Sequence, residues 1–341
     1  MTGGEPVVLI VPPELARTRL DRVVATLLVR AMPGEHASRA AVQRWIDEGR
    51  VRVDGEVGRA ASAVASGARI EVIPGRAQIT DVVPDASVVF QVLFEDAHLI
   101  VLDKPAGLVV HPARGHEEGT LVHGLLARGG FSLPAGEGDD LLRPGIVHRL
   151  DKGTSGVMVV AKDEFTREGL KKLFATHDIE RSYVAITVGK TVTQTIASSH
   201  GRHPTDRLRF TTRIGTGKRA VTHVELVESL GPCSLVRCRL ETGRTHQIRV
   251  HLAEVAGTPV LGDPVYGGRP KDLGVRAMGE ALGRQALHAE VLGFVHPRTG
   301  ERLRFETAVP PDMAKALAEL RHAASILERE PTAKTRRSPR K

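Results

Sequence analysis

Apolar residues near the N-terminus recur with the spacing of an amphipathic helix. Thr18 is the expected N-cap of this helix, with Asp21 three residues later. A second helix is expected to begin after Ser38 and to end at Gly49. The apolar positions of the first helix follow the i, i+3, i+4, i+7 and i+8 pattern of one helical face: Leu20, Val23, Val24, Leu27 and Leu28.

Alternating apolar and polar residues then predict strands. Residues 51–57 (VRVDGEV) contain an Asp54-Gly55 turn, and residues 68–73 (ARIEVI) form the next alternating run. These elements define a small unit at about residues 17–75. The chain from 76 to 89 lies in a stretch with two prolines and no helical period, so we interpret it as a linker.

From residue 90 the pattern becomes strand-rich, with helical spacing at two places. We therefore expect a second domain at 90–325, an α+β fold class for the whole chain, and a basic disordered tail at 326–341. Residues 128–143 have the Gly, Pro and Asp content of a surface loop. The expected strands are 90–96, 98–112, 182–189, 223–228, 234–241 and 303–310, and the expected helices are 164–177 and 312–330.

The composition narrows the class of partner. Lys and Arg outnumber Asp and Glu by 48 to 40 in 341 residues, which suits a polyanion but also serves solubility alone. Eight Phe, two Tyr and one Trp are few for a protein that stacks many bases on aromatic side chains. Two cysteines give no disulfide framework, and no apolar run is long enough to span a membrane. We expect a cytoplasmic protein that acts as a monomer.

Residues 145–162 place charged side chains at the start of a segment that otherwise has the character of a buried strand. His148, Arg149 and Asp151 lie together in HRLDKGTSG. An unpaired carboxylate among apolar groups is costly, so the segment is either a surface hairpin or a site with a counter-charge. The His-Arg pair invites comparison with the catalytic loop of protein kinases, but no glycine-rich phosphate loop and no Asp-Phe-Gly accompany it.

HRLDKGTSG closely resembles the active-site motif of the RluA-type pseudouridine synthases. Further segments resemble motifs of the same family in the same order along the chain. The resemblance implies a catalytic domain with a long, mainly antiparallel, bent sheet and an active-site cleft across its middle. The similar segments are VLDKPAGLVVHP (101–112), RSYVAI (181–186), LETGRTHQIRVHLAEVAGTPVLGDPVYGG (240–268) and RQALHAEVLGFVHP (284–297).

The N-terminal unit resembles the S4 RNA-binding domain, with Arg39 and Arg44 on its helices available for phosphates. A generic small α/β module is the alternative. Together with the segments GDPVYGGRP and RQALHA, the S4-like unit indicates the branch of the family that acts on 23S ribosomal RNA of the large-subunit precursor, at the RNA stem-loop called helix 69. The same chemistry at other ribosomal or transfer RNA sites, and a non-catalytic ribosome-assembly factor, are the competing hypotheses.

The reaction that the resemblance implies, conversion of uridine into pseudouridine, needs a carboxylate and neither a metal nor a coenzyme. It breaks the bond from ribose C1′ to ring N1, turns the base, and rejoins it through C5. One carboxylate at the sugar-base junction suffices, and Asp151 is the candidate. Burial would push that carboxyl toward its neutral form unless an arginine lies beside it. The resemblance implies that this partner is Arg249 rather than Arg244.

The target base must leave the RNA stack to reach the carboxylate. The resemblance implies that Arg149 enters the vacated space and that Tyr183 stacks on the extruded base. The alternatives are a solvated ion pair for Arg149, a half-buried strand residue for Tyr183 and a turn-forming role for Asp151. We expect His148 to lie at the RNA-binding surface as a structural hydrogen-bonding histidine.

Other residues of the arginine motif are expected to contact RNA, namely Arg244, His246 and Gln247. The pairs His200 with His203 and His246 with His251 fit no zinc spacing, so no metal site is expected. Gly215 and Gly217 beside Lys218 and Arg219 are typical of a basic hairpin that touches RNA rather than of a nucleotide-binding loop. Cys233 and Cys238 are expected in or near the core.

Overall fold

The computed structural model describes residues 6–31, 39–73, 83–112, 116–131 and 145–329. The chain divides into two compact units. The first comprises residues 1–87 with 111–118 and 122–145, and the second comprises 88–110, 119–121 and 146–341. Each unit has its own buried apolar core, so each is described by itself.

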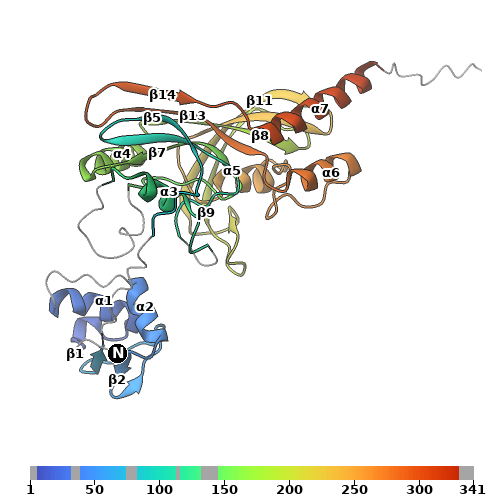
Figure 1. Ribbon diagram of the computed structural model, residues 1–341. Coiled ribbons are helices and arrows are strands. Elements are labelled where there is room, and N and C mark those ends of the chain that lie inside the picture. Colours follow the sequence, from blue (N-terminus) through green and yellow to red (C-terminus); the bar gives the residue numbers. More distant parts are fainter. Residues whose placement is uncertain (1–5, 32–38, 74–82, 113–115, 132–144, 330–341) are drawn as a thin grey trace, which may run out of the picture. The chain divides into compact units, whose positions relative to one another are not determined.

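The first unit contains a four-stranded antiparallel sheet in the order β1-β4-β2-β3 (Figure 1). Its core gathers the apolar face of α1 with Val42 and Ile46 of α2 and the inward residues of the strands. The helices are α1 (Leu20–Ala31), α2 (Arg39–Asp47) and α3 (Leu121–Arg128), with a 3-10 turn at Pro13–Leu15, and the strands are β1 (Val7–Ile10), β2 (Val51–Val53), β3 (Glu56–Val57) and β4 (Arg69–Val72).

The predicted elements of this unit are present, with two corrections. The Asp54-Gly55 turn joins β2 to β3, and both turn residues have positive φ angles of 51° and 89°. Helix α1 begins at Leu20, so Thr18 is not its N-cap as we expected; the Arg19 guanidinium instead bonds the Asp21 carboxylate of the first turn. Strand β1 precedes the predicted boundary at residue 17. The S4-like assignment of this unit stays a prediction.

The second unit is built on a ten-stranded sheet in the order β10-β9-β11-β12-β8-β13-β7-β6-β5, with β14 paired to β13. The pairs are antiparallel except β13 with β7, which confirms the expected α+β fold with a mainly antiparallel sheet. The strands are β5 (Gln91–Glu95), β6 (Leu99–Lys104), β7 (Ser155–Ala161), β8 (Glu180–Val188), β9 (Gln194–Arg202), β10 (Phe210–Thr211), β11 (Lys218–Leu230), β12 (Cys233–Leu240), β13 (Leu287–Val295) and β14 (Arg302–Glu306).

Helices cover this sheet at two places, and at each place helix and strand side chains form a buried apolar core. Near β8, β11 and β12, side chains of α7 and α6 pack on the strands, including Met313, Leu317 and Val275. Near β5, β6 and β7, Leu170 of α4 packs with strand residues (Figure 1). The helices are α4 (Glu164–Thr176), α5 (Gln247–Val250) followed by a π-helical turn at His251–Val255, α6 (Leu273–Leu282) and α7 (Pro311–Arg329).

Several elements of the second unit were not predicted. Strand β9 reads QTIASSHGR, in which polar residues fill inward positions and obscure the alternation. Helix α6 contains two glycines, which lower its helical propensity, although Asp272 caps its start and Gly283, with a φ of 65°, ends it. Helix α7 was predicted at 312–330 and ends at Arg329, so residues 326–329, which the predicted tail also included, are helical.

Other sequence predictions fall partly or wholly outside the described residues. They are the linker from 76 to 82, most of the loop at 128–143, and the tail from residue 330. Within the described part of the chain, no helix combines the length and apolar character needed to cross a bilayer. Cys233 and Cys238 are free and buried in strand β12, and burial raises the pKa of these thiols to about 11 and about 12.

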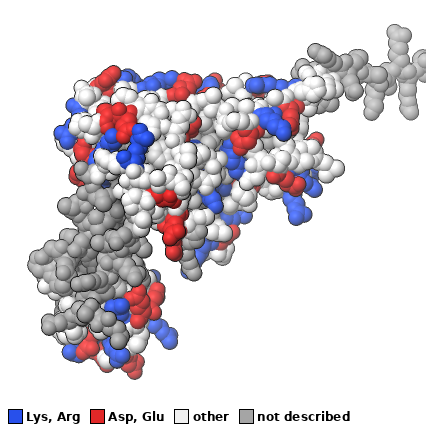
Figure 2. Space-filling view, viewed as in Figure 1, with Lys and Arg blue, Asp and Glu red and all other residues white. Residues whose placement is uncertain are grey.

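The positive charge of the chain is not gathered on the face of the second unit that Figure 2 presents. Lys and Arg side chains there alternate with Asp and Glu, and apolar and neutral surface separates them. A partner that binds this face therefore meets no extended surface of purely positive charge. Any anion-binding role must therefore be argued from particular residues rather than from net charge.

The parallel pairing of β7 with β13 depends on a glycine. Gly156 lies opposite Ala289 with a φ of 121°, and a Cβ at Gly156 would meet the Ala289 carbonyl oxygen and lie 2.6 Å from the Ala289 nitrogen. Gly300 also has a positive φ, of 74°, but a Cβ there would meet nothing within 4 Å. A comparison of substitutions at these two glycines therefore separates the effect of a positive φ angle from the effect of close packing.

We expect Gly156→Ala to lower the free energy of unfolding of the second unit by about 4 kcal/mol or more, because the clash is with backbone that cannot move alone. Gly300→Ala should lose only about 1–2 kcal/mol. Far-UV circular dichroism during urea unfolding measures the effect. Fluorescence of Trp45, the single tryptophan, reports on the first unit as an internal reference. Equal losses in the two variants would contradict the packing argument.

Candidate active site

Asp151 lies in a tight turn directly before the fully buried strand β7. The Thr154 N–H donates to the Asp151 carbonyl oxygen at 3.0 Å, and the Gly107 N–H donates to the Lys152 carbonyl oxygen at 2.8 Å. Gly153 packs so closely on Gln285 that a Cβ would lie 2.5 Å from the Gln285 Oε1 atom. The turn is therefore fixed by its own bonds and by two other segments of the second unit.

Lys104, at the end of β6, is fully buried beneath this turn. Its ammonium group donates to the carbonyl oxygens of Pro105 at 2.8 Å, Leu108 at 2.9 Å and Lys152 at 3.4 Å. Burial lowers the pKa of Lys104 to about 7, and the charge of Asp151 opposes that shift. Lys104 thus ties the turn after β6 to the turn that carries Asp151.

Arg249 of α5 joins two carboxylates. Its Nη1 lies 2.9 Å from Asp151 Oδ2, while its Nε and Nη2 lie 2.7 and 2.8 Å from the two oxygens of Asp263. Asp263 is fully buried in its side chain, Arg249 is 4% exposed and Asp151 is 17% exposed. Burial would lower the pKa of Arg249, but the hydrogen bonds and charge of Asp263, and then Asp151, raise it. The guanidinium therefore stays charged.

Asp263 orients this arginine. Its pKa is lowered: burial would raise it, but the hydrogen bonds and charge of Arg249 and the N–H groups of Tyr266 and Val265 outweigh burial. With both Asp263 oxygens bound to one edge of the guanidinium, the Nη1 group faces Asp151. We did not predict Asp263, although GDPVYGG stood in a quoted motif. The signal was a second aspartate in the segment that carries the arginine.

His246 is held in a left-handed conformation with a φ of 58°, which is uncommon for a residue with a side chain. Its Nδ1 lies 3.0 Å from the Tyr266 hydroxyl, which accepts a bond from the Phe210 N–H. The other ring nitrogen, Nε2, lies 3.8 Å from Asp151 Oδ1. Burial lowers the pKa of His246, so the ring is neutral at neutral pH.

Tyr183 of β8 is half-buried and packs against the core near α6 and α7. Burial raises the pKa of its phenol, the Asp151 charge adds to the rise and the Arg181 charge opposes it. The phenol is therefore neutral and can donate or accept a hydrogen bond. Arg149, two residues before Asp151, is exposed.

One cleft brings most of the predicted residues together. Its volume of about 60 Å³ is below the roughly 300–1,000 Å³ of an ordinary ligand pocket. The cleft is therefore narrower than a pocket that encloses a small ligand. The predicted residues that line it are Arg149, Asp151, Tyr183, Arg244, His246, Gln247 and Arg249.

Two of the residues that were expected to contact RNA have side chains that make hydrogen bonds within the protein. His148 accepts a hydrogen bond at Nε2 from the Val159 N–H at 3.1 Å and stacks on Phe174, and burial lowers its pKa to about 3. Gln247 is 2% exposed, and its amide makes four hydrogen bonds to protein groups. The side chains of Arg39 and Arg44 lie outside the described residues. Among those that are described, no cluster of His, Cys, Asp and Glu could hold a metal ion.

Comparisons with known proteins identify the family of the chain. A family model described as RNA pseudouridylate synthase matches residues 98–254, which include Asp151, Tyr183 and Arg249. The ribosomal large subunit pseudouridine synthase D of Xanthomonas campestris pv. campestris is 41% identical over 318 residues, which cover 92% of each chain. The chain belongs to the RNA pseudouridylate synthase family. It is an RNA-modifying isomerase of the RluA type, as the motifs predicted.

Two further comparisons match most of the chain to proteins of this family. An uncharacterized RNA pseudouridine synthase of Chloroflexus aurantiacus is 42% identical over 323 residues, covering 94% of this chain and 96% of the relative. The solved structure of human RNA pseudouridylate synthase domain containing 4 superposes with a TM-score of 0.53 at 25% identity. It covers 68% of this chain and 93% of the human one.

The buried Arg249–Asp263 pair has a matched exposed counterpart in the same unit. Arg321 of α7 binds Glu228 of β11 through Nε and Nη2, which lie 3.0 and 2.7 Å from Glu228 Oε2, and the two side chains are 52% and 35% exposed. Both pairs join one edge of a guanidinium to a carboxylate, and they differ in burial.

We expect Asp263→Asn to lower the free energy of unfolding by about 3–5 kcal/mol, because it leaves a buried guanidinium with only one carboxylate. Glu228→Gln should lose about 1 kcal/mol or less. The Asp263 contribution is present above the ordinary aspartate pKa and is lost as the pH falls through its lowered folded value. Urea unfolding at several pH values measures both effects. Similar losses in the two variants would contradict the burial argument.

Proposed function

We propose that this synthase converts specific uridines of 23S ribosomal RNA, in the loop of helix 69, into pseudouridine. The relatives that cover nine-tenths of the chain and are named for the large ribosomal subunit support the substrate class. The observation that carries the chemistry is the carboxylate of Asp151 paired with Arg249 in a cleft.

Asp151 acts at the junction of sugar and base. The bond between C1′ and N1 breaks, the base turns within the cleft, and a new bond joins C1′ to C5. The proton on C5 leaves and N1 ends the reaction protonated, so no atom is gained and no electron is transferred. A charged carboxylate can serve as the nucleophile or stabilise the separated sugar, and both roles need it to be ionised.

Arg249 is the counter-charge of that carboxylate. A single hydrogen bond from Nη1 reaches Asp151 Oδ2, while the Asp263 pair fixes the remainder of the guanidinium. The second Asp151 oxygen is bound by no other group within hydrogen-bond distance among the described residues, since His246 Nε2 lies 3.8 Å away. That oxygen is the one available to the substrate.

The other groups of the cleft hold the extruded nucleotide. Tyr183 stacks on the flipped base as a neutral phenol and moves a proton at C5, and the exposed Arg149 occupies the space that the base leaves in the RNA. Arg244 and His246 lie at the rim and contact the RNA backbone. Gln247 acts as a positioning residue, because its amide is used within the protein.

The chemistry is tested with RNA labelled with tritium at C5 of uridine, which is released when C5 forms its new bond. We expect Asp151→Ala to reduce release by about a thousandfold or more, with RNA affinity retained. Asp178→Ala, which removes an exposed carboxylate from the turn after α4, is the matched control and should react as the wild type does. Equal release by wild type and Asp151→Ala would remove Asp151 from its role.

The target is tested separately by mapping pseudouridines in cells that lack the gene. Loss confined to the helix 69 loop supports the proposal, whereas loss at other ribosomal or transfer RNA positions assigns another target. An unchanged map, together with a defect in subunit assembly, would favour a non-catalytic assembly role.

The N-terminal unit is proposed to add affinity through phosphates. Replacing both Arg39 and Arg44 by Ala should weaken RNA binding for all sequences alike. It should also reduce the slope of log affinity against log salt by about 1 for each phosphate that an arginine no longer neutralises. Fluorescence anisotropy at several salt concentrations measures this, with Arg302→Ala of β14 as the control. An unchanged salt slope would contradict the phosphate role.

A further inference from the structure

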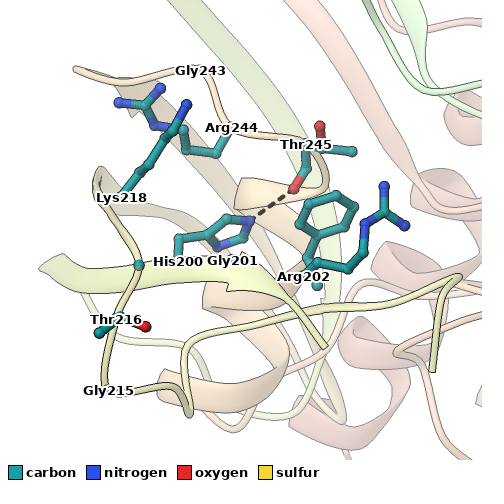
Figure 3. Close-up of a pocket in the computed structure, with 11 residues that line it drawn as sticks. His200, Gly201, Arg202, Gly215, Thr216, Lys218, Gly243, Arg244 and Thr245 are labelled. Carbon is teal, nitrogen blue, oxygen red and sulfur yellow. Dashed lines mark hydrogen bonds between the residues drawn. The ribbon is translucent and has the colours of Figure 1, made fainter. Parts of the chain in front are cut away.

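A second and larger cavity lies beside the catalytic cleft. Its volume is about 800 Å³, against about 60 Å³ for the cleft itself. Four segments form its walls: the end of β9, Phe210 of β10, residues 215–218 at the start of β11, and the turn at 243–245 that precedes α5 (Figure 3). No step of the proposed isomerisation uses this space.

One wall of the cavity is cationic. Lys218 and Arg244 lie near one another there, and the Arg244 Nε donates to the Arg219 carbonyl oxygen at 3.2 Å, which holds the side chain along the wall (Figure 3). Within the described ranges no carboxylate forms an ion pair with Lys218 or Arg244. The neighbouring carboxylates are engaged elsewhere: Glu241 binds Arg219, and Glu254 accepts bonds from two threonines near β10.

The opposite wall is a column of three flat groups. The His200 ring stacks on the Phe210 ring with centroids 5.7 Å apart and an interplanar angle of 8°, and the Arg202 guanidinium lies 4.9 Å above the Phe210 centroid. His200 is buried and bonds the Thr245 carbonyl oxygen at 2.9 Å, which anchors the column, whereas Arg202 is exposed at its end. A guanidinium plane of this kind can stack on a nucleobase.

Glycines let the walls approach each other. A Cβ at Gly217 would lie 2.7 Å from the His200 nitrogen and 2.9 Å from its oxygen, and a Cβ at Gly201 would clash with the Ile214 side chain. The segment before β11 therefore lies directly on β9. The cavity is a built feature of this hairpin rather than a gap between loose loops.

Arg244 belongs to both the cavity and the catalytic cleft. A strand of RNA that places one nucleotide on Asp151 therefore passes a neighbouring nucleotide along the cationic wall. Phosphate needs cations without carboxylate partners, and an unpaired base needs a flat surface; the cavity presents the two on facing walls.

We propose that this cavity is a second nucleotide subsite, which binds a single-stranded nucleotide flanking the target uridine, with its phosphate at Lys218 and Arg244 and its base stacked on Arg202. The subsite rests on the proposed function for the identity of the RNA. In this subsite, residues 215–218 contact the RNA next to the reacting base.

The test uses a fluorescent helix 69 stem-loop in which each nucleotide of the loop is made abasic in turn. Binding is measured by anisotropy at several salt concentrations, for wild type, Arg202→Ala, Arg202→Lys and Lys218→Ala. Arg302→Ala, at an exposed arginine on β14, is the matched control. Release of C5 tritium from the same RNA is measured in parallel and reports on the proposed function alone.

We expect Arg202→Ala to weaken binding about tenfold, the loss typical of one stacked base. One abasic position should weaken wild-type binding by a similar factor and have no effect in Arg202→Ala. Arg202→Lys should lose affinity but keep the salt slope, and Lys218→Ala should reduce that slope by about 0.7. Full additivity of Arg202→Ala with every abasic position, or an unchanged slope in Lys218→Ala, would overturn the subsite whether or not tritium is released.

Discussion

The bond from Arg249 to Asp151 is the interaction on which the rest of the site depends. The buried set contains one guanidinium and two carboxylates, so it carries an excess negative charge. Such an excess is tolerated only where water or another cation reaches it. Asp263 is fully buried, and Asp151 is the most solvent-exposed member of the set. The uncompensated charge is therefore presented at the cleft, where a substrate approaches, and Lys104 beneath the turn offsets part of it.

The sheet brings these groups together from segments far apart in the chain. The Asp151 turn precedes β7, Lys104 ends the neighbouring β6, and the close contact of Gly156 with Ala289 pairs β7 with β13. Gln285, just before β13, packs on Gly153 of the same turn. Backbone pairing thus fixes the carboxylate, while Asp263 fixes the arginine. Each partner of the Arg249–Asp151 bond is therefore positioned by a separate part of the fold, and the charge of Arg249 also offsets the fully buried Asp263 carboxylate.

The sequence predicted which residues share the cleft better than it predicted the groups that position them. Asp151, Arg249 and Tyr183 were predicted because motifs of a known family carry them, and because a carboxylate in a buried segment requires a counter-charge; the structure places the three in one cleft. Asp263 and Lys104 were missed because a buried ion pair and a buried lysine leave no periodic signal. Strand β9 was missed for a related reason: its inward positions are taken by Ser198 and His200, whose burial follows from hydrogen bonds to His251 and Thr245.

The small volume of the catalytic cleft has a consequence for how binding and chemistry are divided. A cleft of about 60 Å³ offers little surface to grip RNA, so affinity must come from groups outside it. Extruding a base costs a few kcal/mol, and contacts to flanking nucleotides supply that free energy without touching the reacting atoms. Arg244 stands between the cleft and the larger cavity. In the subsite that we propose, a bound nucleotide would fix the strand on one side of the target, and the target would be free to turn while its neighbour is held.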